Sequence, residues 1–138
     1  MSITIIYRSY ISVYDPDDPP SNSKVDKVWA LVTSGREMTI QAREIDTGKL
    51  MGVAHFFPIP NLRKGKDLCY LDVLVVKPEA RRFGVGSALL EDLRRVAKEK
   101  DWEVVRWATG REGNEGPRKM YFNFGTTSLD MFQMNALE

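Results

Sequence analysis

Residues 75–87 read VVKPEARRFGVGS and carry the chain from a strand through a turn into a helix. The strand before the turn, residues 68–76, is almost entirely apolar, which is typical of a central strand covered on both faces. Residues 89–97 after the turn place three leucines, a valine and an alanine on one helical face and charged side chains on the other. The stretch therefore predicts a layered α/β or α+β domain with a central sheet.

The turn at residues 81–87 has the properties of an anion-binding cradle. First-turn N–H groups of a helix lack intrahelical partners, and the helix dipole adds partial positive charge there. Gly84 and Gly86 have no Cβ atoms to keep a phosphate away from the backbone. Arg81 and Arg82 would add charge-assisted contacts. This pattern favours a pyrophosphate ligand.

Other phosphate-binding loops fit less well. A P-loop needs Gly-Lys-[Ser/Thr], and no lysine precedes Ser87. The dinucleotide fingerprint needs three glycines as G-x-G-x-x-G, and one is missing here. On spacing alone, a tight strand-to-helix turn with incidental glycines also remains open.

Composition favours one ordinary globular domain over residues 1–138. The 20 Lys+Arg against 19 Asp+Glu argue against a nucleic-acid-binding protein. We find neither an apolar run long enough for a membrane span nor a signal peptide after Met1, so we expect a cytoplasmic protein without a membrane partner. The single cysteine, Cys69, excludes an intramolecular disulfide and is expected to be buried.

Periodicity predicts the remaining elements. We expect strands at 3–10, 37–46, 49–57, 102–109 and 129–137, helices at 25–32 and 116–124, and loops at 15–23 and 58–66. Thr47-Gly48 predicts a hairpin, with a bulge at Gly48. Pro117 fits only the first turn of its helix, and Gly125 is a C-terminal stop signal.

Two linked motifs resemble the GNAT superfamily of N-acetyltransferases. The signature [Q/R]-x-x-G-x-[G/A] after a strand ending V-x-P matches Val76-Lys77-Pro78 followed by Arg81 to Gly86. A second element, a W-x-T strand before N-x-x-A-x-x-x-Y-x-x-x-G, matches Trp107-Ala108-Thr109, Asn114, Pro117, Tyr121 and Gly125. Pro117 replaces the usual alanine, and Thr126 replaces a frequent phenylalanine.

This resemblance covers roughly residues 37 to 137 and implies a mixed, mostly antiparallel central sheet flanked by helices. The region before Glu37 has room for one short helix where the family usually has two, so the N-terminal helical region is expected to be shortened. In this family those helices help to cover the acceptor.

The resemblance also implies a site for acetyl-CoA as co-substrate. Backbone amides of the turn would hold the pyrophosphate, and the end of the strand would pair with the pantetheine arm. Asn114 would contact that arm or cap its helix. The residues implied in binding are Leu74, Val75, Val76, Arg81, Arg82, Phe83, Gly84, Val85, Gly86, Ser87 and Asn114.

Two residues are candidates for catalysis. Tyr121 matches the tyrosine that similar enzymes use to protonate the leaving thiolate, although its periodicity also fits a core aromatic. Asp72 interrupts an apolar strand and would take the acceptor's proton, although a partnered Asp on an exposed face is the alternative. His55 is a second candidate base and water a third. We expect no metal centre, because one His and one Cys are too few.

The sequence thus predicts acetyl transfer to a primary amine of a small molecule or peptide, by direct attack in a ternary complex. A non-catalytic acyl-CoA-binding sensor or partner module is the alternative, and a nucleotide-binding domain of another fold is a third. A homodimer stays open.

Overall fold

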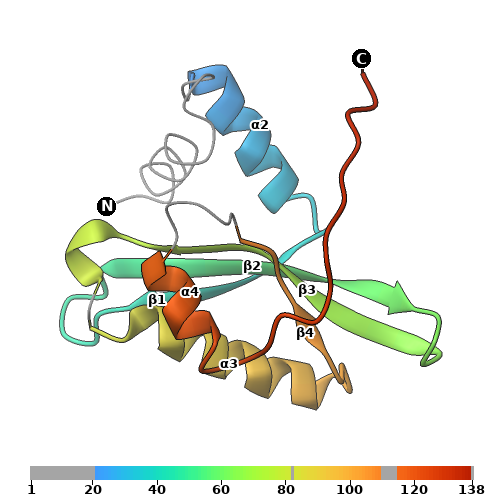
Figure 1. Cartoon of the computed structure of the whole chain (residues 1–138). Coiled ribbons are helices and arrows are strands. Elements are labelled where there is room, and N and C mark those ends of the chain that lie inside the picture. Colours follow the sequence, from blue (N-terminus) through green and yellow to red (C-terminus); the bar gives the residue numbers. More distant parts are fainter. Residues whose placement is uncertain (1–20, 82, 110–114, 138) are drawn as a thin grey trace. The chain divides into compact units, whose positions relative to one another are not determined.

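The computed structural model describes residues 21–81, 83–109 and 115–137, and the chain divides into two compact units, Met1–Arg106 and Trp107–Glu138. The expected strand at 3–10 lies outside the described residues, as do Arg82 and Asn114. The elements of the first unit are α2 (Asn22–Val32), β1 (Met38–Arg43), β2 (Leu50–Asn61), β3 (Lys66–Val76), the 3-10 helix η1 (Pro78–Ala80), α3 (Val85–Glu99) and β4 (Val105–Arg106) (Figure 1).

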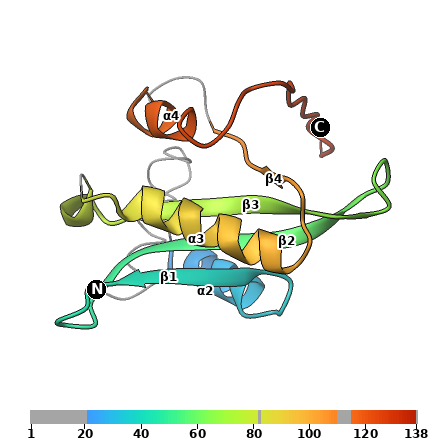
Figure 2. The ribbon, with the colours of Figure 1, turned by 90° about the horizontal axis from the view of Figure 1, so that it is seen from below.

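The first unit is built on a four-stranded sheet in the order β1-β2-β3-β4. Strands β1, β2 and β3 are antiparallel, and β4 runs parallel to β3. A parallel pair needs a crossover connection, which α3 provides. Helix α3 lies along one face of the sheet and α2 on the side of the other face (Figure 1, Figure 2). The expected mixed, mostly antiparallel sheet flanked by helices is confirmed.

The predicted hairpin joins β1 to β2. In the turn, the Glu44 N–H donates to the Lys49 carbonyl and the Gly48 N–H to the Glu44 carbonyl, each at 2.8 Å. Gly48 has a φ of 71°, a left-handed conformation that glycine adopts without strain. The register shift lies between Ala42 and Arg43, so the bulge expected at Gly48 is placed wrongly.

The loop expected at 58–66 is wrong, because β2 continues to Asn61 and β3 begins at Lys66. Pro58 pairs with Cys69, whose N–H donates away from β2 to the Val104 carbonyl at 2.9 Å. In such a pair without mutual hydrogen bonds, the Pro58 nitrogen also points outward. Strand β1 begins at Met38, opposite Phe56, so no described strand lies beside Pro58 on that side. The missing N–H of this proline therefore breaks no hydrogen bond of the described sheet.

Close packing of α3 on the sheet depends on Gly52 in β2. A Cβ atom there would lie 2.8 Å from the Val75 carbonyl oxygen and 3.3 Å from a methyl carbon of Leu89. The helix buries Leu89, Leu90, Leu93 and Ala97, as its periodicity predicts. Each buried leucine contributes on the order of 2 kcal/mol, so this face anchors α3 on the sheet.

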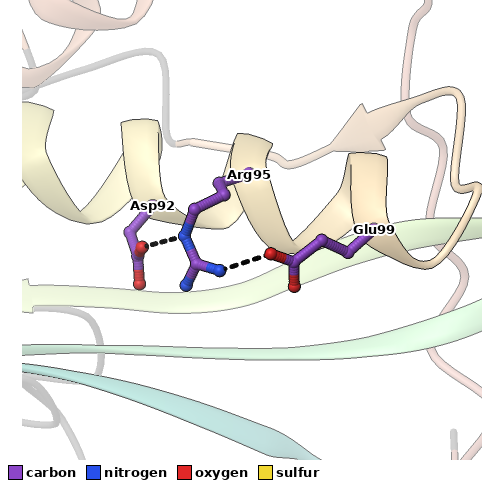
Figure 3. Close-up of polar contacts among 3 residues, drawn as sticks. All are labelled: Asp92, Arg95 and Glu99. Carbon is purple, nitrogen blue, oxygen red and sulfur yellow. Dashed lines mark hydrogen bonds and ion pairs between the residues drawn. The ribbon is translucent and has the colours of Figure 1, made fainter.

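The opposite face of α3 is charged and exposed, as expected. Arg95 donates from Nε to Asp92 Oδ1 at 2.8 Å and from Nη1 to Glu99 Oε1 at 2.7 Å (Figure 3). Arg94 pairs with Glu91 at 3.3 Å. Exposed pairs of this kind contribute little to stability because water screens them, and a solvated helix face accounts for these charges without a functional role.

Helix α2 begins three residues earlier than expected. The Ser21 hydroxyl accepts a hydrogen bond from the Lys24 N–H at 3.1 Å and caps the helix. Val25 is buried, whereas Trp29 and Leu31 are exposed. None of the helices among the described residues is long and apolar enough to span a membrane.

The second unit contains α4 (Glu115–Tyr121), which is shorter than the helix expected at 116–124. The Gly125 N–H donates to the Tyr121 carbonyl at 3.0 Å, but Gly125 is not among the described glycines with positive φ.

Two strand predictions fail. Only Val105–Arg106 of the segment 102–109 forms a strand, and residues 129–137 form none. An apolar pattern cannot form a strand without a partner ladder, and Phe132 stays 90% exposed.

Candidate active site

One edge of β3 is open over its C-terminal half. Strand β4 pairs with β3 only at Cys69↔Val105 and Tyr70↔Arg106. From residue 71 to residue 76, no described strand lies on that side, while β2 continues to pair on the other side as far as Val76. Beyond Tyr70, this side of β3 therefore has no strand partner among the described residues.

The backbone of Leu74 and Val76 faces this open edge. The Lys77 N–H donates to the Met51 carbonyl at 3.0 Å, which makes that position a hydrogen-bonded pair with β2. Because antiparallel pairs alternate, Val75 bonds toward β2, and Leu74 and Val76 point their N–H and C=O groups away from it. Of the three predicted strand residues, these two offer backbone groups to an additional extended chain.

The turn after β3 leads directly into the first turn of α3. Gly84 is the N-cap residue, with a φ of 74°, and its carbonyl accepts the Ala88 N–H at 2.9 Å. The N–H groups of Val85, Gly86 and Ser87 have no partner among the described residues. Three N–H groups without a partner in the described part of the chain thus follow an N-cap residue that lacks a Cβ atom, an arrangement that suits an anion.

Arginine and aromatic side chains flank these amides. Arg81 donates from Nε to the Val76 carbonyl at 3.3 Å, so its guanidinium binds the last residue of β3. Phe83 is 78% exposed. Arg82 and Asn114 lie outside the described residues. The structure therefore places the predicted strand end, Arg81 and the glycine turn next to one another.

Asp72 lies at an irregularity of β3 close to the open edge. His55 pairs with Val73 and Phe56 pairs with Leu71, so Asp72 is an extra residue in the ladder. Such a bulge turns a side chain away from the regular alternation. Asp72 is exposed, which explains how an acidic residue fits into an otherwise apolar strand.

Glu37, which the sequence analysis did not select, is hydrogen-bonded to Asp72 through their side chains. Burial, this hydrogen bond and the negative charge of Asp72 together raise the pKa of Glu37 to about 8. Glu37 therefore keeps its proton to a higher pH than an ordinary glutamate, because ionising it beside the negative charge of Asp72 is unfavourable. Only strand pairing brings the two residues together, so no local sequence signal could have found Glu37.

His55 lies on β2 beside this pair and is completely buried. Its Nδ1 is 2.8 Å from the hydroxyl oxygen of Thr39 on β1. Burial lowers the pKa of His55, although the charge of Asp72 opposes that effect. A buried imidazole that is bonded to Thr39 and has a lowered pKa fits a structural role better than the role of a solvent-exposed base.

Tyr121 ends α4 in the second unit. Its ring packs against Trp107 in an edge arrangement, with centroids 5.7 Å apart. The side chain is half-buried, and its carbonyl accepts the N–H groups of Phe124 and Gly125. Both interpretations of Tyr121, as a core aromatic and as a proton donor, are compatible with this position.

Other reactive groups are poor candidates. Cys69 is buried, and burial raises the pKa of its thiol to about 11, so it is not a thiolate at neutral pH. No cluster suited to a metal ion occurs in the described part of the chain.

An open cavity of about 290 Å³ lies between the hairpin and the turn, lined by Glu44, Lys49, Met51, Lys77, Glu79 and Phe83. Neither the open edge of β3 nor the first-turn amides of α3 line this cavity.

Comparison with known proteins identifies the family. The acetyltransferase (GNAT) family matches residues 3–125 of the sequence. The chain belongs to this family. The GNAT match covers the described sheet, the glycine turn and α4, and family membership implies acetyl transfer from acetyl-CoA to an acceptor. No curated protein matches the sequence significantly.

Solved structures share the GNAT fold with this chain. A probable acetyltransferase has a TM-score of 0.80 at 20% identity, covering 99% of this chain and 89% of that one. A ribosomal-protein-alanine N-acetyltransferase from Brucella melitensis biovar Abortus 2308 has a TM-score of 0.78 at 19% identity, covering 96% and 88%. A putative acetyl transferase from Pyrococcus furiosus has 0.76 at 18%, covering 96% and 90%. At these identities the likeness establishes the fold alone.

Proposed function

We propose that this GNAT protein transfers an acetyl group from acetyl-CoA to a primary amine of a small molecule or peptide, by direct attack in a ternary complex. One observation carries the proposal, namely that the open edge of β3 runs into the unpartnered amides of the first turn of α3. The edge suits an extended amide-containing arm, and the amides suit a diphosphate. Acetyl-CoA has these two parts in this order.

In the proposed complex, the outward backbone groups of Leu74 and the N–H of Val76 pair with the pantetheine arm, while the Val76 carbonyl accepts from Arg81. The amides of Val85, Gly86 and Ser87 donate to the pyrophosphate. The Leu74 and Val76 N–H groups would also be available to stabilise the oxyanion of the tetrahedral intermediate. Arg82, Phe83 and Asn114 remain proposed binding residues from the family resemblance.

The reaction removes two protons from the acceptor ammonium. Asp72 takes the first, and the neutral amine nitrogen then attacks the thioester carbonyl carbon. Collapse of the tetrahedral intermediate breaks the C–S bond, and Tyr121 protonates the leaving thiolate. Tyr121 recovers a proton from the nitrogen, so the second proton ends on the CoA thiol. Neutralising an alkylammonium of pKa near 10.4 at pH 7 costs about 4–5 kcal/mol, which explains the need for a base.

Thiol release from acetyl-CoA in the presence of a panel of amines tests the proposal. The panel includes a peptide with an N-terminal alanine, since one structural neighbour is named for that acceptor. We expect release with at least one amine and a loss of roughly 10²-fold or more in Tyr121→Phe, as is common when a general acid is removed. Phe122→Leu, an exposed neighbour on the same segment, is the matched control and should keep full activity.

The alternatives give different results. Tight CoA binding with no transfer to any amine would identify a sensor or partner module. Displacement of CoA by ATP or NAD would identify a nucleotide-binding domain. Sedimentation tests the homodimer, which stays a prediction together with the cytoplasmic location and the lack of nucleic-acid and membrane partners.

A further inference from the structure

A buried cation lies beside the turn that joins β3 to α3. The Lys77 side chain is 1% exposed, and its Nζ forms an ion pair with Glu79 Oε1 at 3.4 Å, whereas the Glu79 side chain is 53% exposed. In the described part of the chain, Lys77 forms no other ion pair. A lysine is rarely buried unless a partner compensates its charge, and Glu79 is that partner here.

The ion pair keeps the Glu79 carboxylate on the hairpin side of the turn. Lys77 and Glu79 both line the cavity between the β1–β2 hairpin and the turn, and the first-turn amides of α3 do not. The Lys77 backbone is fixed, because its N–H donates to the Met51 carbonyl at 3.0 Å and its carbonyl accepts the Ala80 N–H at 2.9 Å. A fixed, buried ammonium therefore sets the direction of a carboxylate that is itself half-exposed.

Glu79 lies close to the amides that are proposed to hold the pyrophosphate. It lines the same cavity of about 290 Å³ as Phe83, which lies two residues before Val85, the first of these amides. A hydrogen bond with its own backbone N–H lowers the pKa of Glu79, and the charge of Lys77 lowers it further, so Glu79 is ionised at neutral pH. Like charges repel over roughly 8–10 Å at 0.1–0.15 M salt. An uncompensated carboxylate here would therefore weaken diphosphate binding.

We propose that Lys77 is a positioning residue for CoA binding: it holds and neutralises the Glu79 carboxylate on the hairpin side of the turn, so that the amides of α3 bind the diphosphate without an uncompensated negative charge beside them. The inference rests on the proposed binding of CoA at this turn. Lys77 occupies the variable position of the V-x-P strand end, so the motif itself does not require a lysine there.

A role in stability alone predicts a different result. Buried ion pairs add little to stability, and the cost of breaking one comes mainly from the charge that stays buried. Water would solvate the half-exposed Glu79 carboxylate in the absence of Lys77. Lys77→Met, which replaces the ammonium with an apolar side chain of similar length, should therefore keep its stability and lose CoA affinity.

The test is a double-mutant cycle on CoA affinity, measured by isothermal titration calorimetry at neutral pH. We expect Lys77→Met to bind CoA roughly 3- to 10-fold more weakly, Glu79→Gln to bind it as the wild type does, and the double variant to recover wild-type affinity. Urea denaturation checks that each variant keeps its fold. Lys49→Met is the matched control and should keep its CoA affinity, because Lys49 lines the same cavity but forms no ion pair with a described residue.

The outcomes separate this inference from the proposed function. A wild-type protein that binds no CoA removes both together. In a protein that binds CoA, a double variant as weak as Lys77→Met overturns the inference alone, as does an equal loss in Lys49→Met. A gain from Glu79→Gln that is the same with and without Lys77 also overturns it, because the carboxylate is then not held.

Should Lys77→Met not fold, the wild-type protein and Glu79→Gln decide by themselves. Equal CoA affinity in these two proteins supports the inference, because a carboxylate that is held and neutralised does not repel the diphosphate. Tighter CoA binding by Glu79→Gln overturns it.

Discussion

At the scale of single residues, the proposed CoA site is expected to depend strongly on Gly84. It combines a left-handed backbone with open space, since a Cβ atom there would meet no other atom within 4 Å. In the free protein a side chain at this position is therefore strained but not blocked. In the complex, the same side chain would stand beside the amides that are proposed to hold the pyrophosphate.

We expect Gly84→Val to weaken CoA binding by roughly 100-fold or more, because it combines backbone strain of about 1–2 kcal/mol with a branched side chain beside the phosphate. Isothermal titration calorimetry with CoA measures this. Gly48→Val is the matched control, since Gly48 also has a positive φ with nothing within 4 Å but lies in the β1–β2 hairpin. It should lose similar stability and keep its CoA affinity. Equal affinity in both variants would refute the cradle.

Residue-scale features were also the easiest to predict from sequence. Gly84, Gly86 and Arg81 lie in one short segment, so their juxtaposition follows from local spacing. Asp72 can be chosen as a candidate from sequence because a charged residue in an apolar strand needs a reason. Glu37 was missed because its relation to Asp72 exists only through two strand pairings, which local spacing does not encode.

At the scale of elements, the close approach of α3 to the sheet fixes where its first turn lies relative to the end of β3. Gly52 permits that approach, and the buried leucines of α3 hold it. The helix was predicted well because its apolar period is long and regular. The ends of β2 and β3 were predicted poorly, because Pro58 and Pro60 indicate a loop unless the free edge beside them is known.

Gly52→Ala should lower the free energy of unfolding by about 1–3 kcal/mol, as overpacking of a well-packed core does. The new methyl group would lie 2.8 Å from a backbone oxygen, which cannot move as freely as a side chain. Urea denaturation followed by circular dichroism measures the change. Gly116→Ala in α4, where nothing lies within 4 Å of the added atom, should be neutral or stabilising. A neutral Gly52→Ala would show that α3 is not held this closely.

At the scale of the whole molecule, the chain divides into one unit with the sheet, the glycine turn and the Glu37–Asp72 pair, and another with Tyr121. Sequence motifs named residues in both units, and the fold class followed from them. The strand expected at 129–137 does not form. The sequence could not show this, because an apolar pattern does not specify which strand it would pair with. Elements defined by their own period were thus predictable, and those defined by distant partners were not.

The Glu37–Asp72 pair should also make the stability of the whole fold depend on pH. The Glu37 pKa rises from 4.5 in the unfolded chain to about 8 in the folded protein, so the folded state binds the proton more tightly. Its contribution is complete below pH 4.5 and is lost as the pH rises through 8. Burial lowers the pKa of His55, which acts in the opposite direction only below its usual 6.5. Between pH 7 and 8, below the range in which Cys69 titrates in the unfolded chain, the urea midpoint should therefore fall in the wild-type protein and stay nearly constant in Glu37→Gln. Parallel slopes in the two proteins would mean that Glu37 is ionised in the folded state at neutral pH.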